Sequence, residues 1–325
     1  MGNVLFVSQN PLGRCENLTA VWEAYDGDKA FRHGQDGMRT AERDGFSVVV
    51  CDALPAYIEG KSSVKVVNIC HGITGNKFYG LDEGDEPWID RDAFAQTDYA
   101  ITASVDSIPI VAGQLGIPTE RVLPLGIPRT DAYVGARKGD GGTFMAHNSR
   151  AYLYVPTFRG YVDGGWIPRI DWQKVDRMLG DDEVLVVKRH YFTEKPIVDA
   201  ACMNVVEILP DLPAGPYIID CDVILTDYSS VEFDGYLCGK PSVLTTDDAD
   251  VFLANRRMYH HYPDFYSSRW LDVERNEEAL VMSLRLAAQF GMTKVERDCI
   301  RTLAGACDGH STERVCKLIH EIVGA

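Results

Sequence analysis

Short apolar segments alternate with polar, helix-forming segments along most of the chain. In the first half, four segments are short, rich in β-branched residues and bounded by polar residues or glycine: Val4–Ser8, Ser47–Cys51, Val64–Cys70 and Tyr99–Ala103. Segments that are apolar on both faces are typical of strands buried within a parallel sheet. Between these expected strands the pattern predicts helices, among them one around Gly37–Asp44 and one around Ser107–Leu115.

The same alternation begins again after residues 135–142, a glycine-rich polar segment that is the best candidate for a linker. The second half is expected to hold strands at Ala151–Val155, Glu183–Lys188, Val223–Thr226 and Ser242–Leu244, and helices at Trp172–Leu179, at Ser230–Cys238, after Asn276 and from Ser311. The last helix carries apolar residues at i, i+3 and i+4 spacing, so this face needs a packing partner.

Two successive runs of strand and helix predict an α/β protein with two Rossmann-like domains facing across a cleft. We expect the first domain to cover residues 1–140 and the second residues 141–325, and the last helix is a candidate to pack back on the first domain. Ligands of such sheets bind at the carboxyl ends of the strands. Polar residues directly after a predicted strand are therefore the first candidates for a site.

Composition narrows the possible partners. Among 325 residues, 32 Lys and Arg stand against 48 Asp and Glu, a net charge of −16, which argues against nucleic acid as a partner. The first ten residues lack the basic and apolar regions of a signal peptide, so none is expected, and the sequence contains no apolar stretch of membrane-spanning length. Its nine cysteines are scattered and include no C-x-x-C pair, which favours reduced, mostly buried thiols in a cytoplasmic protein over disulfides or a zinc site.

The strongest local signal is the segment Asp222–Ser230. A buried strand is expected to end at Thr226, and Ser229 or Ser230 then opens a helix. The free N–H groups of a first helical turn, with two hydroxyls beside them, suit a phosphate or diphosphate. The structural alternative is a simple helix cap, in which Asp227 orders the turn.

A second signal is the apolar strand that delivers Lys188, Arg189 and His190 at its carboxyl end. Alternation of side chains points Lys188 and His190 one way and Arg189 the other. Arg159 follows the strand Ala151–Val155 of the same expected domain and adds a further guanidinium at a strand end. The alternative is an ordinary solvated strand end.

In the first half, His71 lies just past a strand in a glycine-containing turn, where an imidazole can serve as a general base. The alternative is a structural histidine bonded to a nearby carbonyl. Arg129 and Asp131 follow the strand that begins at Val122, and such a pair is often no more than a surface ion pair. No acidic cluster has clear divalent-metal spacing, and Asp234 is interpreted as structural. No cofactor is expected, and the sequence leaves the metal requirement open.

Taken together, these short motifs and their order along the chain resemble those of the CDP-glycerol glycerophosphotransferase family. This family comprises the teichoic-acid primases and polymerases of TagB/TagF type. The matching stretches are His71-Gly72 to Lys77, Gly126–Asp131, Pro156–Arg159, Lys188–His190, Thr226–Ser230 with Phe233-Asp234, Lys240-Pro241 and Asp308–Arg314. Two positions depart from the family pattern. Tyr191 stands where a proline usually follows the second histidine, and the first motif reads His71-Gly-Ile-Thr-Gly-Asn-Lys77 instead of H-G-T-P-x-K.

The resemblance implies a GT-B-like fold, an acceptor-side first domain, and a CDP-glycerol or related CDP-polyol donor bound mainly by the second domain. It implies catalytic roles for His71 and His190. The residues implied to hold the donor diphosphate are Arg159, Lys188, Ser229 and Ser230, with Arg129, Asp131, Asp227 and Lys77 in support.

The activity expected from the resemblance is transfer of glycerol phosphate, or a related polyol phosphate, to a hydroxyl of a surface-polymer or saccharide acceptor, with release of CMP. The acceptor is expected to be lipid-linked or an oligosaccharide, and the enzyme cytoplasmic, at most peripheral at the inner face of the membrane. One alternative is a GT-B glycosyltransferase that uses a nucleotide sugar. Another is a nucleotide-binding module without activity.

Overall fold

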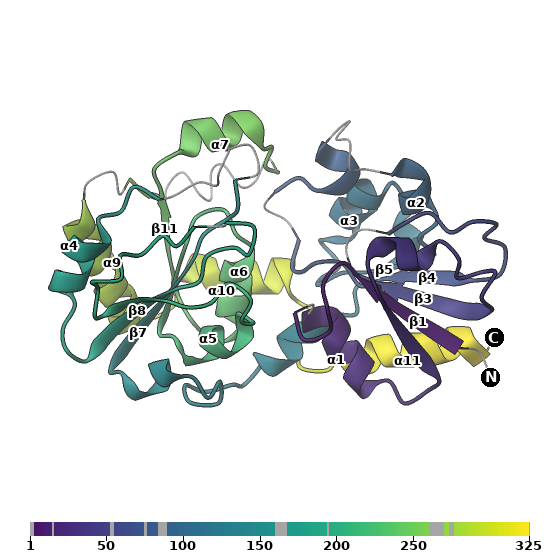
Figure 1. The fold of residues 1–325 in the computed structure, drawn as a ribbon, viewed down its shortest axis with the longest axis horizontal. Helices are drawn as coiled ribbons and strands as arrows, with labels where there is room; N and C mark the ends of the chain where they lie inside the picture. Colours follow the sequence, from purple (N-terminus) through teal and green to yellow (C-terminus); the bar gives the residue numbers. More distant parts are fainter. Residues whose placement is uncertain are drawn as a thin grey trace. The chain divides into compact units, whose positions relative to one another are not determined.

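A computed structural model describes residues 3–14, 16–52, 55–74, 77–83, 90–159, 168–193, 195–259, 270–272 and 276–324. The chain divides into two compact units. The first combines Met1–Val134 with Arg301–Ala325, and the second is Gly135–Ile300 (Figure 1). The first unit is thus built from two separate stretches of the chain, and the glycine-rich segment opens the second.

The first unit contains a six-stranded sheet in the order β2-β1-β3-β4-β5-β6, and all neighbouring strands are parallel. Its strands are β1 (Asn3–Ser8), β2 (Lys29–His33), β3 (Phe46–Cys51), β4 (Lys65–Asn68), β5 (Tyr99–Ile101) and β6 (Val122–Leu123). Its α-helices are α1 (Glu16–Ala24), α2 (Arg91–Ala95), α3 (Ile108–Leu115) and α11 (Ser311–Gly324), and its 3₁₀ helices are η1 (Gln35–Met38), η2 (Gly80–Glu83), η3 (Thr119–Arg121) and η4 (Pro128–Ala132).

Both faces of this sheet are covered. Helices α1 and α11 pack on one face, where Phe6, Val48 and Val67 meet Leu18 of α1 and Ile319 of α11. The other face is buried in two further clusters, one of which includes residues of α2 and α3. Burial on both faces explains why the central strands read as continuous apolar runs.

The second unit repeats the architecture with a parallel sheet in the order β12-β11-β10-β7-β8-β9. Its strands are β7 (Arg150–Val155), β8 (Glu183–Val187), β9 (Val205–Glu207), β10 (Val223–Thr226), β11 (Ser242–Thr246) and β12 (Trp270–Asp272). Its helices are η5 (Phe144–His147), α4 (Trp172–Met178), α5 (Gly215–Asp220), α6 (Val231–Leu237), α7 (Ala249–Asn255), α9 (Glu277–Phe290) and α10 (Lys294–Leu303), which continues into the first unit.

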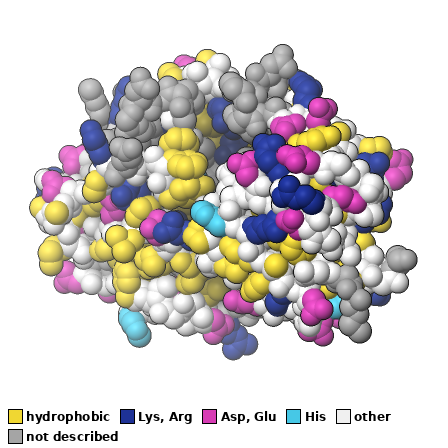
Figure 2. All heavy atoms as spheres, turned by 45° about the vertical axis from the view of Figure 1, so that its right-hand side comes forward, with side chains coloured by type: hydrophobic (Ala, Val, Ile, Leu, Met, Phe, Trp, Pro, Cys, Tyr) yellow, Lys and Arg dark blue, Asp and Glu magenta, His cyan; other side chains and the backbone are white. Residues whose placement is uncertain are grey.

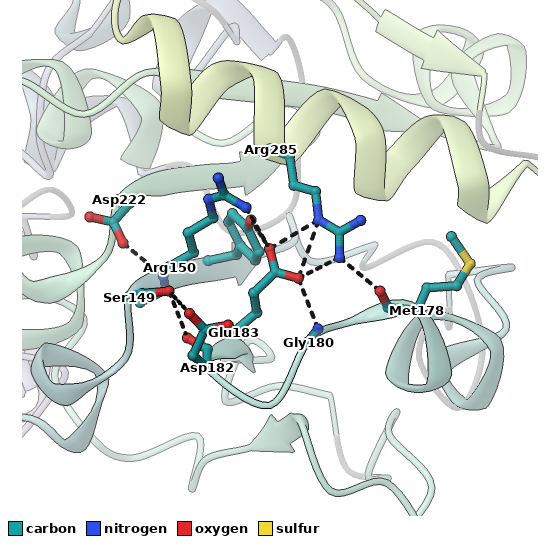
Figure 3. A network of polar contacts seen from close by, with 10 residues as sticks. Ser149, Arg150, Met178, Gly180, Asp182, Glu183, Asp222 and Arg285 are labelled. Atoms are coloured by element: carbon teal, nitrogen blue, oxygen red, sulfur yellow. Dashed lines mark hydrogen bonds and ion pairs between the residues drawn. The ribbon is translucent and has the colours of Figure 1, made fainter.

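Helices α4 and α9 close one face of this second sheet, where Tyr154, Leu185 and Leu225 pack against Val175 of α4 and Leu284 of α9. A buried carboxylate fixes the amino-terminal edge of the same face. Figure 3 shows Arg285 reaching from α9 to Glu183, with Nε donating to Oε1 at 3.0 Å. The hydroxyl of Tyr152 and the N–H of Gly180 also donate to Glu183, each at 2.9 Å. Arg285 and these donors lower the pKa of Glu183 to about 2.

The glycine-rich segment is an ordered loop. The buried carboxylate of Asp220 accepts from the N–H groups of Gly139 at 2.8 Å, Gly141 at 3.1 Å and Thr143 at 2.7 Å. A side chain at Gly141 would lie 2.1 Å from the carbonyl oxygen of Pro216, so only glycine fits there. This segment therefore starts the second unit as a fixed turn rather than a free linker.

One expected helix is wrong. Residues 37–44 form the end of η1 and a series of turns. Arg32 donates from Nη1 to the carbonyl of Gly37 at 3.0 Å and to the hydroxyl of Thr40 at 3.1 Å, so these groups are satisfied by a side chain instead of a helical ladder. Gly34 and Gly45 flank the segment at positive φ, a conformation that glycine adopts readily.

Two further findings concern the cysteines and the length of the helices. The described cysteines are free thiols, several of them buried, while Cys15 lies outside the described residues. Among the helices that the structure describes, none combines the length and the apolar character needed to cross a bilayer.

Candidate active site

In the second unit, the carboxyl ends of β7, β8, β10 and β11 meet at one edge of the sheet because these strands are parallel. Register places Thr226 of β10 beside Val155 of β7, and Tyr154 of β7 beside Val187 of β8. The segments after these strands, 157–159, 188–190 and 227–230, are therefore neighbours. The structure brings together the candidates that the sequence places in the second half.

Arg159 lies beneath this edge rather than on it. Its side chain is fully buried and donates from Nη1 to Asp227 at 2.7 Å and from Nε and Nη2 to Asp248, each at 2.9 Å. The guanidinium also stacks over the rings of Tyr228 and Phe252. This geometry makes Arg159 an internal tie between strand ends, in contrast to the diphosphate contact that the resemblance implies.

Asp227 orders the turn at the end of β10. Its carboxylate accepts from the N–H of Thr157 at 2.8 Å and from its own neighbour Tyr228 at 2.6 Å, in addition to Arg159. These bonds fix the segment after β7 to the turn that carries the two serines. The supporting role expected for Asp227 is thus a structural one in this geometry.

Ser229 and Ser230 are half-buried at the start of α6. Ser230 occupies the N-cap position, but its backbone is helical and its hydroxyl makes no capping bond. The N–H of Val231 donates to Ser229 Oγ at 3.4 Å, a long bond. A simple capping role therefore does not account for the hydroxyl of Ser230.

The three polar residues after β8 make different contacts: Lys188 and Arg189 both reach groups in or just after β9, and His190 lies against a ring that follows β7. Arg189 turns toward β9 and donates to Glu207 at 2.8 Å and to the carbonyl of Thr193 at 2.8 Å. Lys188 is half-buried, and its Nζ donates to the carbonyl of Pro210 at 3.2 Å. His190 is half-buried and stacks on Phe158, with 5.3 Å between the ring centroids.

His71 of the first unit projects from a strained turn after β4. The N–H of Cys70 donates to the side-chain oxygen of Asn68 at 2.9 Å, and Cys70 has φ 55°. A cysteine rarely adopts this left-handed conformation, and such strain concentrates at functional sites. Gly75 and Asn76 of the same motif lie outside the described residues.

Two side chains from distant segments hold this turn. The buried Asn17 of α1 donates to the carbonyls of Cys70 and His71, each at 3.2 Å, and accepts from the backbone N–H of Arg129 at 3.1 Å. The guanidinium of Arg129 donates to the carbonyl of His71. The side chain of Arg129 thus contacts the backbone of His71, not its imidazole. Asn17 is a residue that the sequence analysis missed.

The surroundings of His71 keep its ring neutral. Desolvation by the surrounding protein, and the positive charges of Arg129 and Lys77, lower the pKa of His71 to about 4. His71 is nevertheless exposed to solvent. Its lowered pKa means that the imidazole is uncharged at neutral pH. An imidazole that stays unprotonated at neutral pH is ready to accept a proton.

Asp131 anchors the terminal helix. Its carboxylate accepts from the N–H groups of Ser311 at 2.9 Å and Thr312 at 2.7 Å, the first residues of α11. Gly126 has φ +85°, and a side chain there would meet Ser311 Oγ at 2.2 Å. Asp131 and Gly126 therefore dock α11 on the first unit, which explains their place in the motif.

No group of three or more His, Cys, Asp or Glu side chains among the described residues is arranged to hold a metal ion. On the face shown in Figure 2, basic side chains lie interspersed with acidic and apolar ones instead of forming one continuous basic field.

Comparison with known proteins identifies the family of the chain. The sequence profile of the family described as CDP-Glycerol:Poly(glycerophosphate) glycerophosphotransferase matches residues 41–321. The chain belongs to this family. Membership of this family confirms that the protein is an enzyme that transfers a polyol phosphate from a CDP-activated donor. It favours this activity over the two alternatives, a nucleotide-sugar glycosyltransferase and an inactive nucleotide-binding module.

Two relatives of the glycerophosphotransferase chain are named as teichoic acid primases for polyol phosphates. The teichoic acid glycerol-phosphate primase of Bacillus subtilis (strain 168) is 22% identical over 279 residues, which cover 83% of this chain and 71% of the primase. The teichoic acid ribitol-phosphate primase of Bacillus spizizenii is 26% identical over 285 residues, which cover 82% of this chain and 72% of the primase.

Solved structures confirm the α/β, GT-B-like fold. The wall teichoic acid polymerase TagF, in a crystal soaked with CDPG, superposes with a TM-score of 0.81 at 18% identity, covering 99% of this chain and 89% of the polymerase chain. The UDP-GlcNAc 2-epimerase of Methanocaldococcus jannaschii superposes with a TM-score of 0.59 at 12% identity, covering 99% of this chain and 100% of the epimerase. Because two chemistries share this fold, the fold alone does not assign the activity.

Proposed function

We propose that the enzyme transfers glycerol phosphate, or a related polyol phosphate, from its CDP-activated donor to a hydroxyl of a lipid-linked or oligosaccharide acceptor in cell-wall polymer synthesis. The observation that carries the proposal is the match over residues 41–321 together with a neutral His71 at a strand end of the first unit. We place the enzyme in the cytoplasm, at most peripheral at the inner face of the membrane, where a CDP-activated donor and a lipid-linked acceptor would meet.

In the proposed reaction, an acceptor hydroxyl oxygen attacks the β-phosphorus of the donor. The new P–O bond forms while the bond from the β-phosphorus to the bridging oxygen breaks, and CMP leaves with that electron pair. His71 accepts the proton of the attacking hydroxyl. Lys188, His190 and the hydroxyls of Ser229 and Ser230 bind the diphosphate, where the leaving charge develops.

The residue roles have a direct test in purified enzyme. His71→Gln should lower turnover about 10²–10⁴-fold, the usual contribution of a general base, and should leave CDP binding in calorimetry unchanged. His190→Gln should weaken both binding and turnover. Exposed His147 provides the control, and His147→Gln should match the wild type. Full activity in His71→Gln would contradict its role as base.

The donor and acceptor need a separate assay. Release of CMP is followed with CDP-glycerol and CDP-ribitol in parallel, each with a lipid-linked disaccharide and with a free saccharide as acceptor. The proposal expects turnover with at least one CDP-polyol when a hydroxyl acceptor is present. Hydrolysis of the donor at an equal rate without any acceptor would contradict transfer.

A further inference from the structure

An aromatic cluster surrounds His190. The ring of Tyr191 lies nearly parallel to the imidazole, with 4.4 Å between centroids and 26° between planes, and Phe158 lies at 5.3 Å and 24°. Phe192 completes the cluster, 5.2 Å from His190 and 4.3 Å from Tyr191. The imidazole is thus held in plane by rings from two different loops.

The backbone of the same turn selects one form of the imidazole. The N–H of Thr193 donates to the carbonyl of His190 at 2.8 Å, which closes a tight turn. The N–H of Phe192 donates to His190 Nδ1 at 3.3 Å. A ring nitrogen that accepts a bond carries no proton, so the neutral ring is protonated on Nε2. Nε2–H is then the donor that the ring can offer to a ligand.

Core packing does not explain the two outer rings. Tyr191 is 45% exposed and Phe192 is 56% exposed, although large aromatic side chains usually gain most from burial. Arg189 holds the other end of the loop through its bond to the carbonyl of Thr193. A loop that is fixed on both sides, and that keeps its rings on a histidine, is suited to setting the direction of that histidine.

We propose that Tyr191, together with Phe158, is a positioning residue that holds His190 as an Nε2–H donor toward a phosphate oxygen of the donor substrate. This inference rests on the proposed function, in which His190 binds the diphosphate. Tyr191 acts through the imidazole and needs no contact with the substrate itself.

The test combines a spectroscopic signature with kinetics on the full chain. Enzyme labelled with ¹⁵N in its histidine rings gives long-range ¹H–¹⁵N spectra that distinguish the two neutral tautomers, and His190→Gln assigns the signal. The wild type should show the Nε2–H form. Tyr191→Ala should show a mixture of tautomers, and Tyr191→Phe, which keeps the stacked ring, should restore the Nε2–H form.

Kinetics should follow the spectra. In Tyr191→Ala, kcat with the CDP-polyol should fall about 3- to 30-fold, and CDP affinity should fall with it but by less than in His190→Gln, because the imidazole is still present but less well directed. Tyr191→Phe should match the wild type. Phe290 is 75% exposed on α9, and Phe290→Ala is the control for loss of a surface ring.

Either of two results overturns the inference: an Nδ1–H ring in the wild type, or a single Nε2–H tautomer with unchanged kcat in Tyr191→Ala. The ring signal also separates this inference from the proposed function. Should no CDP-polyol be turned over by the wild type, the proposed function fails, and the tautomer spectra still decide whether Tyr191 orients His190. Thermal melting confirms that each variant is folded before it is compared.

Discussion

Replacing Arg159 with methionine distinguishes an internal tie from a phosphate ligand. The side chains of Arg159 and Asp227 have no exposed surface, and that of Asp248 is 12% exposed. Removing one partner of a buried ion pair typically costs about 3–5 kcal/mol because it leaves an uncompensated buried charge. Here two carboxylates lose their cation at once, so we expect Arg159→Met to reach at least the lower end of that range.

The assay is urea unfolding of the full chain, followed by fluorescence and by calorimetric CDP binding below the transition. A chain with two units can unfold in two steps, so the step that belongs to the second unit is the one compared. Arg150→Met is a suitable control because its ion pair with Glu183 is long, at 3.4 Å, and Arg150 is 45% exposed. Arg150 is half exposed, and Glu183 keeps its bonds to Arg285, Tyr152 and Gly180 when Arg150 is replaced, so we expect a cost of about 0–1 kcal/mol.

One result would refute the reasoning. If Arg159→Met kept its stability within about 1 kcal/mol of the wild type while CDP affinity fell, the guanidinium would be a phosphate ligand. Arg159→Lys keeps the charge but loses the two-pronged contact with Asp248, and it provides a milder variant should the methionine variant fail to fold.

Three further predictions concern the His71 turn and the base of the second sheet. In Lys77→Gln, loss of a cation should raise the pKa of His71 from about 4 toward its usual value of 6.5. The acid limb of the pH profile of kcat/KM should therefore move to higher pH. An acid limb that does not move would exclude His71 as the titrating base. Asn17→Leu removes the side-chain donor to the carbonyl of Cys70 and one of two donors to the carbonyl of His71. It should lower stability by about 1–3 kcal/mol and kcat by about 10-fold or more, as measured by melting and CMP release. Glu183→Gln should destabilise the chain by about 1–3 kcal/mol at neutral pH. Because the pKa of Glu183 is about 2 in the folded chain against 4.5 ordinarily, that difference should be full above pH 4.5 and shrink as pH falls toward 2, and a difference independent of pH would contradict the ion pair with Arg285.

The parallel sheets were predictable because a strand buried on both faces leaves a continuous apolar run. Strand β2 was not, since Lys29–His33 lies at the sheet edge, no residue of it is fully buried, and its sequence therefore shows no apolar run. The turn at 37–44 depends on contacts made by Arg32, which a local pattern does not contain.

The site shows the same division. A polar residue directly after an apolar strand is a local signal, and it is the signal that makes His71, Lys188 and His190 candidates. The position of the Arg159 side chain depends on its bonds to Asp248, which lies 89 positions further along the chain. The hydrogen bond between Asn17 and the N–H of Arg129 joins residues 112 positions apart. Local spacing identifies which residues reach the strand ends, whereas long-range pairing decides which of them remain available to a ligand.

The return of α11 makes the second unit an insertion within the first. Both chain ends lie on the first unit (Figure 1). A fragment that stops at Val134 would lose Val315 and Ile319, and the sheet face under them would meet water. Residues 135–300 keep their own sheet and core, so they form the separable module. Expressed alone, residues 135–300 should fold around that core, whereas the first unit requires both of its segments, supplied in one chain through a short linker or as two complementing pieces.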